Sequence, residues 1–248
     1  MGLISENIKE VRARIERAAE RSGRKAEDIT LVCVTKSRTV EEIGEALAAG
    51  EFQLGENRAQ EFLEKYSNIQ DIAERSAKKP NIMWNFIGQL QRNKVKYLTG
   101  KISLIHSVDN FKLAEEIDAR AAGAGEPAQV LIQLNPAGEA QKSGVAFSEC
   151  EAFIDEISSR LPYVKVRGLM VMVPAVEDPE DVRGYFRGAK QVFDKIAGDR
   201  GGTEAGFEHL SMGMTHDFEI AVEEGATMVR VGTAIFGLRN SGYRPDEH

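Results

Sequence analysis

The chain is poor in the residues that form disulfide frameworks and metal centres. Its 248 residues include only two cysteines and four histidines. Cys33 and Cys150 stand far apart and form no metal or redox motif, so we expect both to be small core residues in a reducing compartment. The histidines lack ligand spacing with one another or with cysteine, and we therefore predict no metal site. His106 and His209 fall in predicted strands and are expected to be satisfied core histidines.

Long apolar runs and an excess of positive charge are missing as well. No stretch approaches the roughly 18 apolar residues of a membrane helix, and residues 1–24 are charged throughout, without the apolar core of a signal peptide. The 32 basic and 39 acidic residues give a net charge of −7, which offers no electrostatic footprint for nucleic acid or an anionic membrane. We therefore expect a soluble, cytoplasmic protein that binds neither.

Helical and strand periodicities alternate along the chain. An amphipathic helix is predicted over residues 5–22, ahead of the first strand. The predicted strands cover residues 31–36, 52–55, 82–87, 102–108, 130–134, 166–173, 207–211 and 228–232. Eight strands alternating with helices, in a chain close to the roughly 250 residues typical of the fold, predict a closed α/β barrel in preference to an open doubly wound sheet. The expected architecture is a single (β/α)8 domain over residues 1–248, with an extra N-terminal helix.

Capping signals mark the starts of three predicted helices. Thr39 with Glu42, and Ser148 with Glu151, have the spacing of a capping box. Asp109 closes the fourth predicted strand and is expected to be a helix N-cap. These residues predict where the covering helices begin.

The first predicted strand ends in a lysine. An apolar run leads through Thr35 to Lys36, and strand alternation places Lys36 on the same side as Val32 and Val34. If that side is the inside of a barrel, the amine lies at the mouth of a pocket. A lysine desolvated there can attack a carbonyl to form an imine. A lone lysine at a strand end more often caps the strand and reaches water, so this residue alone does not decide between the two interpretations.

Glycines and hydroxyl side chains follow the last two predicted strands. Ser211 and Gly213 come after the seventh strand, and Gly232 and Thr233 after the eighth. In barrels these two loops often form a phosphate site, because glycine lets backbone N–H groups approach an anion and hydroxyls add further donors. Together with Lys36 they describe one ligand that carries a phosphate and an aldehyde. Pyridoxal 5′-phosphate fits that description.

The eighth predicted strand also carries an arginine. Arg230 lies two residues before Gly232, and hence on the same face of the barrel, where it could meet the ring of such a ligand. A barrel-interior arginine paired with a carboxylate is the competing interpretation, and both stay open.

Short stretches from the first strand to the last turn match a known family. They are Val34-Thr35-Lys36, Gly55-Glu56-Asn57, residues 84–88, Leu90-Gln91, Asn93-Lys94, and residues 135–144, 167–170, 210–214 and 229–237. In these stretches the chain resembles the pyridoxal phosphate homeostasis proteins, which share the barrel of the alanine racemase N-terminal domain. The matches cover nearly the whole chain, and their order and number make the resemblance specific.

The resemblance implies a fold type III barrel that binds pyridoxal 5′-phosphate through a Schiff base at Lys36. It places Asn57 in the lining of the pocket and Arg230 near the pyridine nitrogen. It also implies phosphate contacts from Ser211, Gly213, Gly232 and Thr233. An arginine beside that nitrogen should keep it unprotonated, because two positive charges repel in a low-dielectric site. The electron-sink behaviour needed for most carbanion chemistry on this cofactor is then weakened.

Three residues complete the comparison with the family pattern. Asn85 stands where the family commonly has histidine, and His216 where a serine-containing turn is usual; neither is expected to touch the imine or the phosphate loops. Lys142 lies on the loop after the fifth predicted strand, where the family keeps a lysine. By default it is a solvated loop lysine, and the alternative is transient binding of the cofactor.

Two function classes remain. The first is a binding protein that buffers pyridoxal 5′-phosphate and supplies it to apoenzymes without committed catalysis; the second is an amino-acid racemase resembling alanine racemase. Racemisation needs a second acid–base group opposite the lysine, which in the racemases is a tyrosine of the partner subunit's C-terminal domain. The chain ends soon after Gly237, and none of its five tyrosines is an obvious substitute. We therefore expect a carrier and, without that domain, a monomer.

Overall fold

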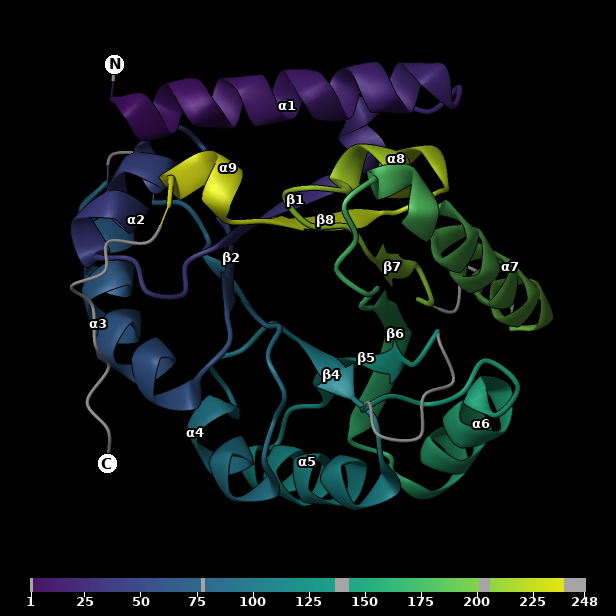
Figure 1. Ribbon diagram of the computed structural model, residues 1–248. Helices are drawn as coiled ribbons and strands as arrows, with labels where there is room; N and C mark the ends of the chain where they lie inside the picture. Colours follow the sequence, from purple (N-terminus) through teal and green to yellow (C-terminus); the bar gives the residue numbers. More distant parts are fainter. Residues whose placement is uncertain (1, 77–78, 137–142, 201–205, 239–248) are drawn as a thin grey trace.

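Eight parallel strands close into a barrel in the order of the sequence. The structure is a computed structural model that describes residues 2–76, 79–136, 143–200 and 206–238 (Figure 1). The strands are β1 (Thr30–Val34), β2 (Gln53–Glu56), β3 (Met83–Phe86), β4 (Leu104–Val108), β5 (Ala128–Leu134), β6 (Val164–Val171), β7 (His209–Ser211) and β8 (Met228–Val231). The parallel pairing of β1 with β8 closes the ring, and the predicted (β/α)8 barrel is confirmed.

Helices surround the barrel. They are α1 (Leu3–Arg21), α2 (Val40–Ala48), α3 (Ala59–Arg75), α4 (Val95–Leu98), α5 (Phe111–Ala124), α6 (Cys150–Arg160), α7 (Arg183–Asp199), α8 (Phe218–Glu223) and α9 (Thr233–Phe236), with short 3₁₀ turns η1 (Ala26–Asp28), η2 (Arg92–Lys94) and η3 (Pro179–Val182). The predicted N-terminal helix is α1, which lies along α8 and α9 and buries Ile8, Val11 and Ile15 (Figure 1). Within the described ranges, no helix is long and apolar enough to cross a bilayer.

The predicted capping signals have different outcomes. Thr39 and Glu42 form the expected capping box at the start of α2. The cap of α5 is Asn110 instead of Asp109, because the Asn110 side chain accepts a hydrogen bond from the Leu113 N–H at 3.0 Å. The predicted capping box at Ser148 is wrong, since α6 begins at Cys150 after Glu149 and has no side-chain cap.

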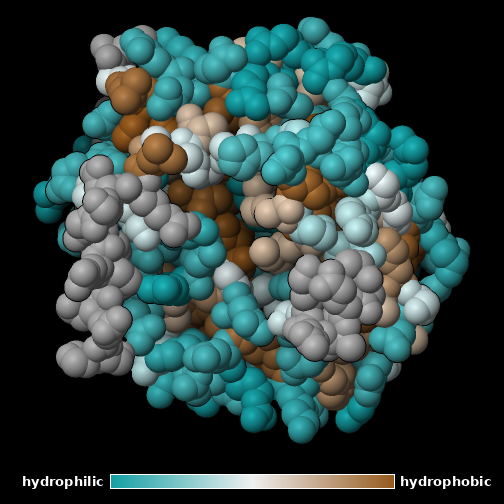
Figure 2. All heavy atoms as spheres, viewed as in Figure 1, coloured by the Kyte–Doolittle hydropathy of each residue, from teal (hydrophilic) through white to brown (hydrophobic). Residues whose placement is uncertain are grey.

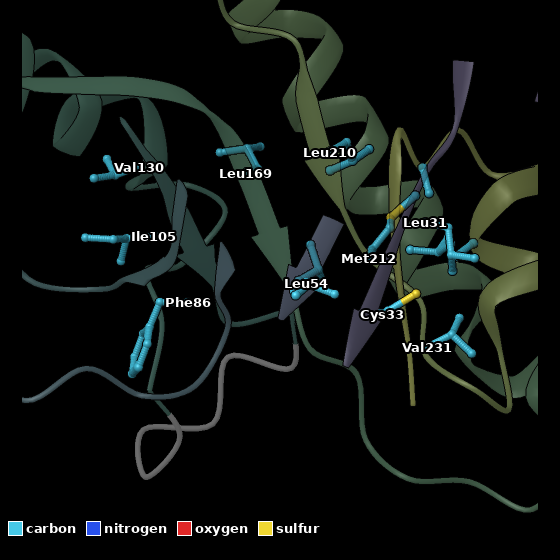
Figure 3. Close-up of a cluster of buried hydrophobic side chains, with 14 of the residues drawn as sticks. Leu31, Cys33, Leu54, Phe86, Ile105, Val130, Leu169, Leu210, Met212 and Val231 are labelled. Carbon is cyan, nitrogen blue, oxygen red and sulfur yellow. The ribbon is translucent and has the colours of Figure 1, made fainter. Parts of the chain in front are cut away.

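Strand alternation separates two apolar layers. Residues such as Leu31, Cys33 and Leu54 point outward from the barrel and pack beneath the helices (Figure 3). A smaller cluster fills the inside of the barrel and consists of Val32, Leu104, Leu131, Met170 and Met228. Cys33 and Cys150 are both buried, and burial raises the pKa of each thiol, as expected for structural cysteines.

Candidate ligand-binding site

A cavity of about 540 Å³ lies at the carboxyl ends of the strands. This is the end of a parallel barrel where binding sites are found. Its described lining includes five of the seven predicted site residues, namely Lys36, Asn57, Arg230, Gly232 and Thr233. In the space-filling view, apolar side chains lie deep in a hollow near the middle of the visible face, with polar side chains around it (Figure 2). The structure therefore brings most of the predicted site residues into one pocket.

The charge of the cavity lining is one-sided. Lys36, Arg38 and Arg230 contribute cationic groups, and no acidic side chain occurs among the described residues that line it. The whole chain, in contrast, has a net charge of −7. Cationic groups in a partly desolvated concave site attract anions more strongly than the same groups in water. The cavity is thus suited to an anionic ligand.

Lys36 enters this cavity from the turn that follows β1. The strand ends at Val34, two residues earlier than predicted, and Lys36 lies in the turn. Val34 and Lys36 both line the cavity, whereas Thr35 between them is fully buried. The predicted alternation therefore holds past the end of the strand. The next residue, Ser37, has a left-handed backbone conformation with φ 58°.

Asn57 presents a polar atom that lacks a protein partner. It follows β2 and lines the cavity, and its Oδ1 atom is buried with no hydrogen-bond partner within the described chain. A buried acceptor without a donor costs about 1–3 kcal/mol. Asn57 is the cavity-lining member of the small set of buried side-chain atoms without a partner in the described chain, which also includes Glu56 Oε2, Trp84 Nε1 and Ser107 Oγ.

Arg230 rests on a buried chain of polar groups. Its Nη1 donates to Ser211 Oγ at 2.7 Å and its Nη2 donates to the Val171 carbonyl at 3.0 Å. Ser211 Oγ lies 3.0 Å from His106 Nδ1, and His106 Nε2 lies 3.0 Å from Asn85 Oδ1. The guanidinium can only donate, so the Ser211 proton is directed to Nδ1, and the imidazole carries its own proton on Nε2. Each hydrogen bond in this series is then donated in the same direction, from Arg230 through Ser211 and His106 to Asn85.

The polar chain carries a single charge, which lies at its pocket end. Burial lowers the pKa of His106 well below its ordinary value, and the nearby Arg230 lowers it further. Burial also lowers the pKa of Arg230 to about 10, which leaves the guanidinium charged at neutral pH. Within the described residues, no ion pair joins Arg230 to a carboxylate; Asp217 acts on it only through space. The described structure therefore does not support the competing interpretation, in which a carboxylate pairs with Arg230.

Two predicted site residues lie beneath the cavity and do not line it. Ser211 is fully buried, and its hydroxyl is engaged with Arg230 and His106, so its side chain supports the arginine and makes no wall of the pocket. Gly213 has φ +90°, and a Cβ there would lie 2.6 Å from Ala221 Cβ. Its carbonyl accepts from the Arg230 N–H at 3.0 Å. This glycine is required by the turn itself and by its close packing against α8.

Two ionisable side chains besides the seven predicted site residues, Arg38 and His216, also line the cavity. Arg38 is buried, and its Nη1 donates to the Phe236 carbonyl at 2.9 Å, which holds the end of the short helix α9 that Thr233 begins. Its position two residues after Lys36 was a usable signal. His216 also lines the cavity, and that it touches neither the imine nor the phosphate loops stays a prediction. Lys142 lies outside the described residues.

Comparisons with known proteins agree on one family. The model of the alanine racemase N-terminal domain matches residues 7–240. The pyridoxal phosphate homeostasis protein of Aquifex aeolicus is 44% identical over 234 residues, which cover 94% of this chain and 97% of that protein. An unknown protein from Bifidobacterium adolescentis, 36% identical, superposes with a TM-score of 0.87 over 94% of both chains. PipY of Synechococcus elongatus PCC7942, solved with PLP bound, is 30% identical with a TM-score of 0.77 over 94% of this chain and 100% of that chain.

Proposed function

The chain belongs to the alanine racemase N-terminal domain family, and on that premise we propose that it is a carrier of pyridoxal 5′-phosphate that serves homeostasis of the cofactor without committed catalysis. The observation that carries this proposal is the cavity lining, in which Lys36, Arg38 and Arg230 supply cationic groups and no described side chain is acidic. A relative that binds PLP and relatives with homeostasis names support it.

The described residues fit such a ligand at each end. Lys36 would hold it through a covalent bond between the amine and the aldehyde carbon of the cofactor. Gly232 and Thr233, after β8, would hold the phosphate at the start of α9, where the first backbone N–H groups have no intrahelical acceptor. Asn57, which lines the cavity, would lie beside the ligand.

Arg230 would set the character of the bound ring. Its guanidinium stays charged and is fixed by Ser211 and Val171, so a proton on a nearby ring nitrogen would add a second positive charge in a buried site. When bound, pyridoxal 5′-phosphate supplies an aldehyde that condenses reversibly with amines, and protonation of its ring nitrogen is what makes it a strong electron sink. Arg230 thus favours exchange of amines over carbanion chemistry.

The racemase alternative rests on a different residue. No tyrosine lines the cavity within the described part of the chain, but His216 does, and histidine is suited to proton transfer near neutral pH. A racemase would need such a group opposite Lys36 and within reach of an α-hydrogen. The carrier and the racemase therefore make opposite predictions for the α-proton of a bound amino acid.

Two measurements on the loaded protein test this proposal. Proton NMR of L- and D-alanine in deuterated buffer should show no α-deuteration at an enzymatic rate, while an excess of a PLP-dependent apoenzyme should acquire activity from the loaded protein. The His216→Ala variant should behave in the same way. Rapid α-deuteration that is lost in His216→Ala and in Lys36→Ala would contradict the carrier and establish a single-domain racemase. Transfer to apoenzymes, a monomeric state and a cytoplasmic location stay predictions.

A further inference from the structure

A buried cluster of charged side chains lies directly behind the turn that carries Lys36. It consists of Glu56 at the end of β2 and of Glu61 and Lys65 on α3, each less than a tenth exposed. The Lys65 ammonium donates to Glu56 Oε1 at 2.8 Å and to Glu61 Oε1 at 2.7 Å. None of these three side chains lines the cavity, so ligand binding as described above does not use them.

The cluster makes contacts on both sides of Lys36. On the N-terminal side, Lys65 Nζ donates to the Thr35 carbonyl at 2.7 Å, and the Thr35 hydroxyl donates to Glu56 Oε1 at 2.6 Å. On the C-terminal side, Glu61 Oε1 accepts a hydrogen bond from the Ser37 N–H. The residues immediately before and after the lysine are therefore tied to one group of buried charges.

The conformation of this turn needs such support. Ser37 has φ 58°, which lies in the left-handed region that residues with a Cβ avoid. Strained backbone of this kind persists where the surrounding structure over-determines it, and it concentrates at functional sites. Here the Ser37 N–H donates a hydrogen bond to Glu61, which supports the turn that carries Lys36.

Fold stability alone is a weak reason for buried charges at this position. Buried ion pairs are expensive to desolvate, and well-packed apolar residues often replace them without loss of stability. Apolar side chains, however, can neither accept from the Ser37 N–H nor donate to the Thr35 carbonyl. The Glu61 carboxylate supplies the acceptor for the Ser37 N–H, and the Lys65 ammonium supplies the donor for the Thr35 carbonyl.

We propose that Glu61 and Lys65 are positioning residues for Lys36, which hold its backbone on both sides so that the amine is presented to the aldehyde of the ligand. This inference rests on the proposed function, since it concerns the bond that Lys36 makes there. Because groups held in place before binding lose less freedom on binding, the cluster contributes selectively to the covalent part of the interaction.

The experiment compares two ligands that differ only at the reacting carbon. Pyridoxal 5′-phosphate can bond to Lys36, whereas 4-deoxypyridoxine 5′-phosphate has the same ring and phosphate with a methyl group in place of the aldehyde. Dissociation constants of both are measured for the full chain and for Glu61→Ala, Glu61→Gln and Ser37→Pro. Glu61→Gln retains an acceptor for the Ser37 N–H, whereas Glu61→Ala removes it. Ser37→Pro removes the N–H itself and fixes φ at about −65°, which excludes the left-handed conformation.

Glu51→Ala serves as the matched control. Glu51 is also a buried glutamate, but it pairs with Arg12, with a hydrogen bond of 2.8 Å from Arg12 Nε, and it precedes β2 at the opposite end of the barrel from the cavity. Its loss should lower thermal stability without a selective effect on either ligand. The control thus separates general destabilisation from loss of positioning.

We expect Glu61→Ala and Ser37→Pro to lose about tenfold in affinity for pyridoxal 5′-phosphate, with less than about a twofold change for the deoxy analogue, and Glu61→Gln to retain most of the affinity. If Glu61→Ala does not fold, Ser37→Pro decides. In these two variants, equal losses for both ligands or no loss for either ligand would overturn the positioning role. A native protein that binds the two ligands equally well would instead overturn the proposed function, because Lys36 would then make no covalent bond.

Discussion

Lys65 and Arg230 are both buried cations near the same pocket, but their surroundings differ. The Lys65 ammonium contacts two carboxylates and a carbonyl, so its charge is balanced inside the protein. The Arg230 guanidinium contacts a hydroxyl and a carbonyl, and no carboxylate binds it within the described residues. Arg230 lines the cavity and Lys65 does not. The cation that remains unbalanced by the protein is the one that faces the ligand.

The charge of Lys65 therefore stabilises the protein itself, whereas the charge of Arg230 is available to a ligand in the cavity. A buried charge without a counterion is costly, and it persists where a ligand or its environment completes it. Arg230 is satisfied as a hydrogen-bond donor through Ser211 and yet keeps its full charge for the pocket. Lys65 uses its charge to hold carboxylates and backbone around Lys36. Removing Lys65 should therefore cost more stability than removing Arg230, whereas removing Arg230 acts directly on the binding of the ligand.

The largest effect is expected for Lys65→Met, which leaves Glu56 and Glu61 buried without their shared cation. Removing one partner of a buried ion pair typically costs about 3–5 kcal/mol, and we expect a loss of this size in the free energy of unfolding. Urea denaturation of the ligand-free protein at neutral pH measures it. A loss below about 1 kcal/mol would show that Lys65 is not balanced in the way that the contacts indicate.

Arg230→Met should have a smaller effect on stability and a larger one on the ligand. The variant removes a buried charge that no contacting carboxylate offsets, so the free energy of unfolding should change by no more than about 1–2 kcal/mol. The affinity for pyridoxal 5′-phosphate should fall by about one to two decades, since interactions with charged groups contribute about 1.5–3 kcal/mol. Unchanged affinity, measured by titration of the absorbance, would remove Arg230 from the site.

The polar chain beneath Arg230 predicts a smaller, pH-dependent effect. Burial lowers the pKa of His106 below the 6.5 of an unfolded chain, so the unfolded state binds a proton first as the pH falls. Neutral His106 therefore makes its full contribution to stability above pH 6.5. This contribution is lost as the pH falls below 6.5, by at most about 1.4 kcal/mol per pH unit. Burial raises the pKa of Glu56, whose contribution therefore has the opposite sign and declines as the pH rises.

Stability curves of the native chain and of His106→Gln test this assignment. Between pH 6.5 and 5 the native chain should lose stability more steeply than the variant, and the contribution of Glu56 cancels in the comparison. Parallel curves would mean that His106 is protonated in the fold, and that the direction of the hydrogen bonds from Arg230 is different.

Local sequence patterns predicted the barrel and most of the pocket, because strand period and loop position both follow from neighbouring residues. Lys36, Gly232 and Thr233 were found in this way, and all three line the cavity. The Ser211 hydroxyl was assigned to a phosphate, but its burial and its bonds depend on β4 and β8, which are distant in the sequence. The contacts of Lys65 with Thr35 are equally non-local, since 30 residues separate them. Hydrogen bonds between strands and helices carry no periodic signal, so the support around Lys36 became visible only in the fold.

Lys36 is the residue that we propose forms the covalent bond to pyridoxal 5′-phosphate. The most direct measurement is borohydride reduction of the loaded protein, followed by mass spectrometry of its peptides. We expect a phosphopyridoxyl group on Lys36 at nearly full occupancy, and we expect Lys36→Ala to lose that group and the absorbance band while it retains the fold. A modified Lys65 or Lys142, or a reducible band that survives Lys36→Ala at full strength, would contradict this assignment.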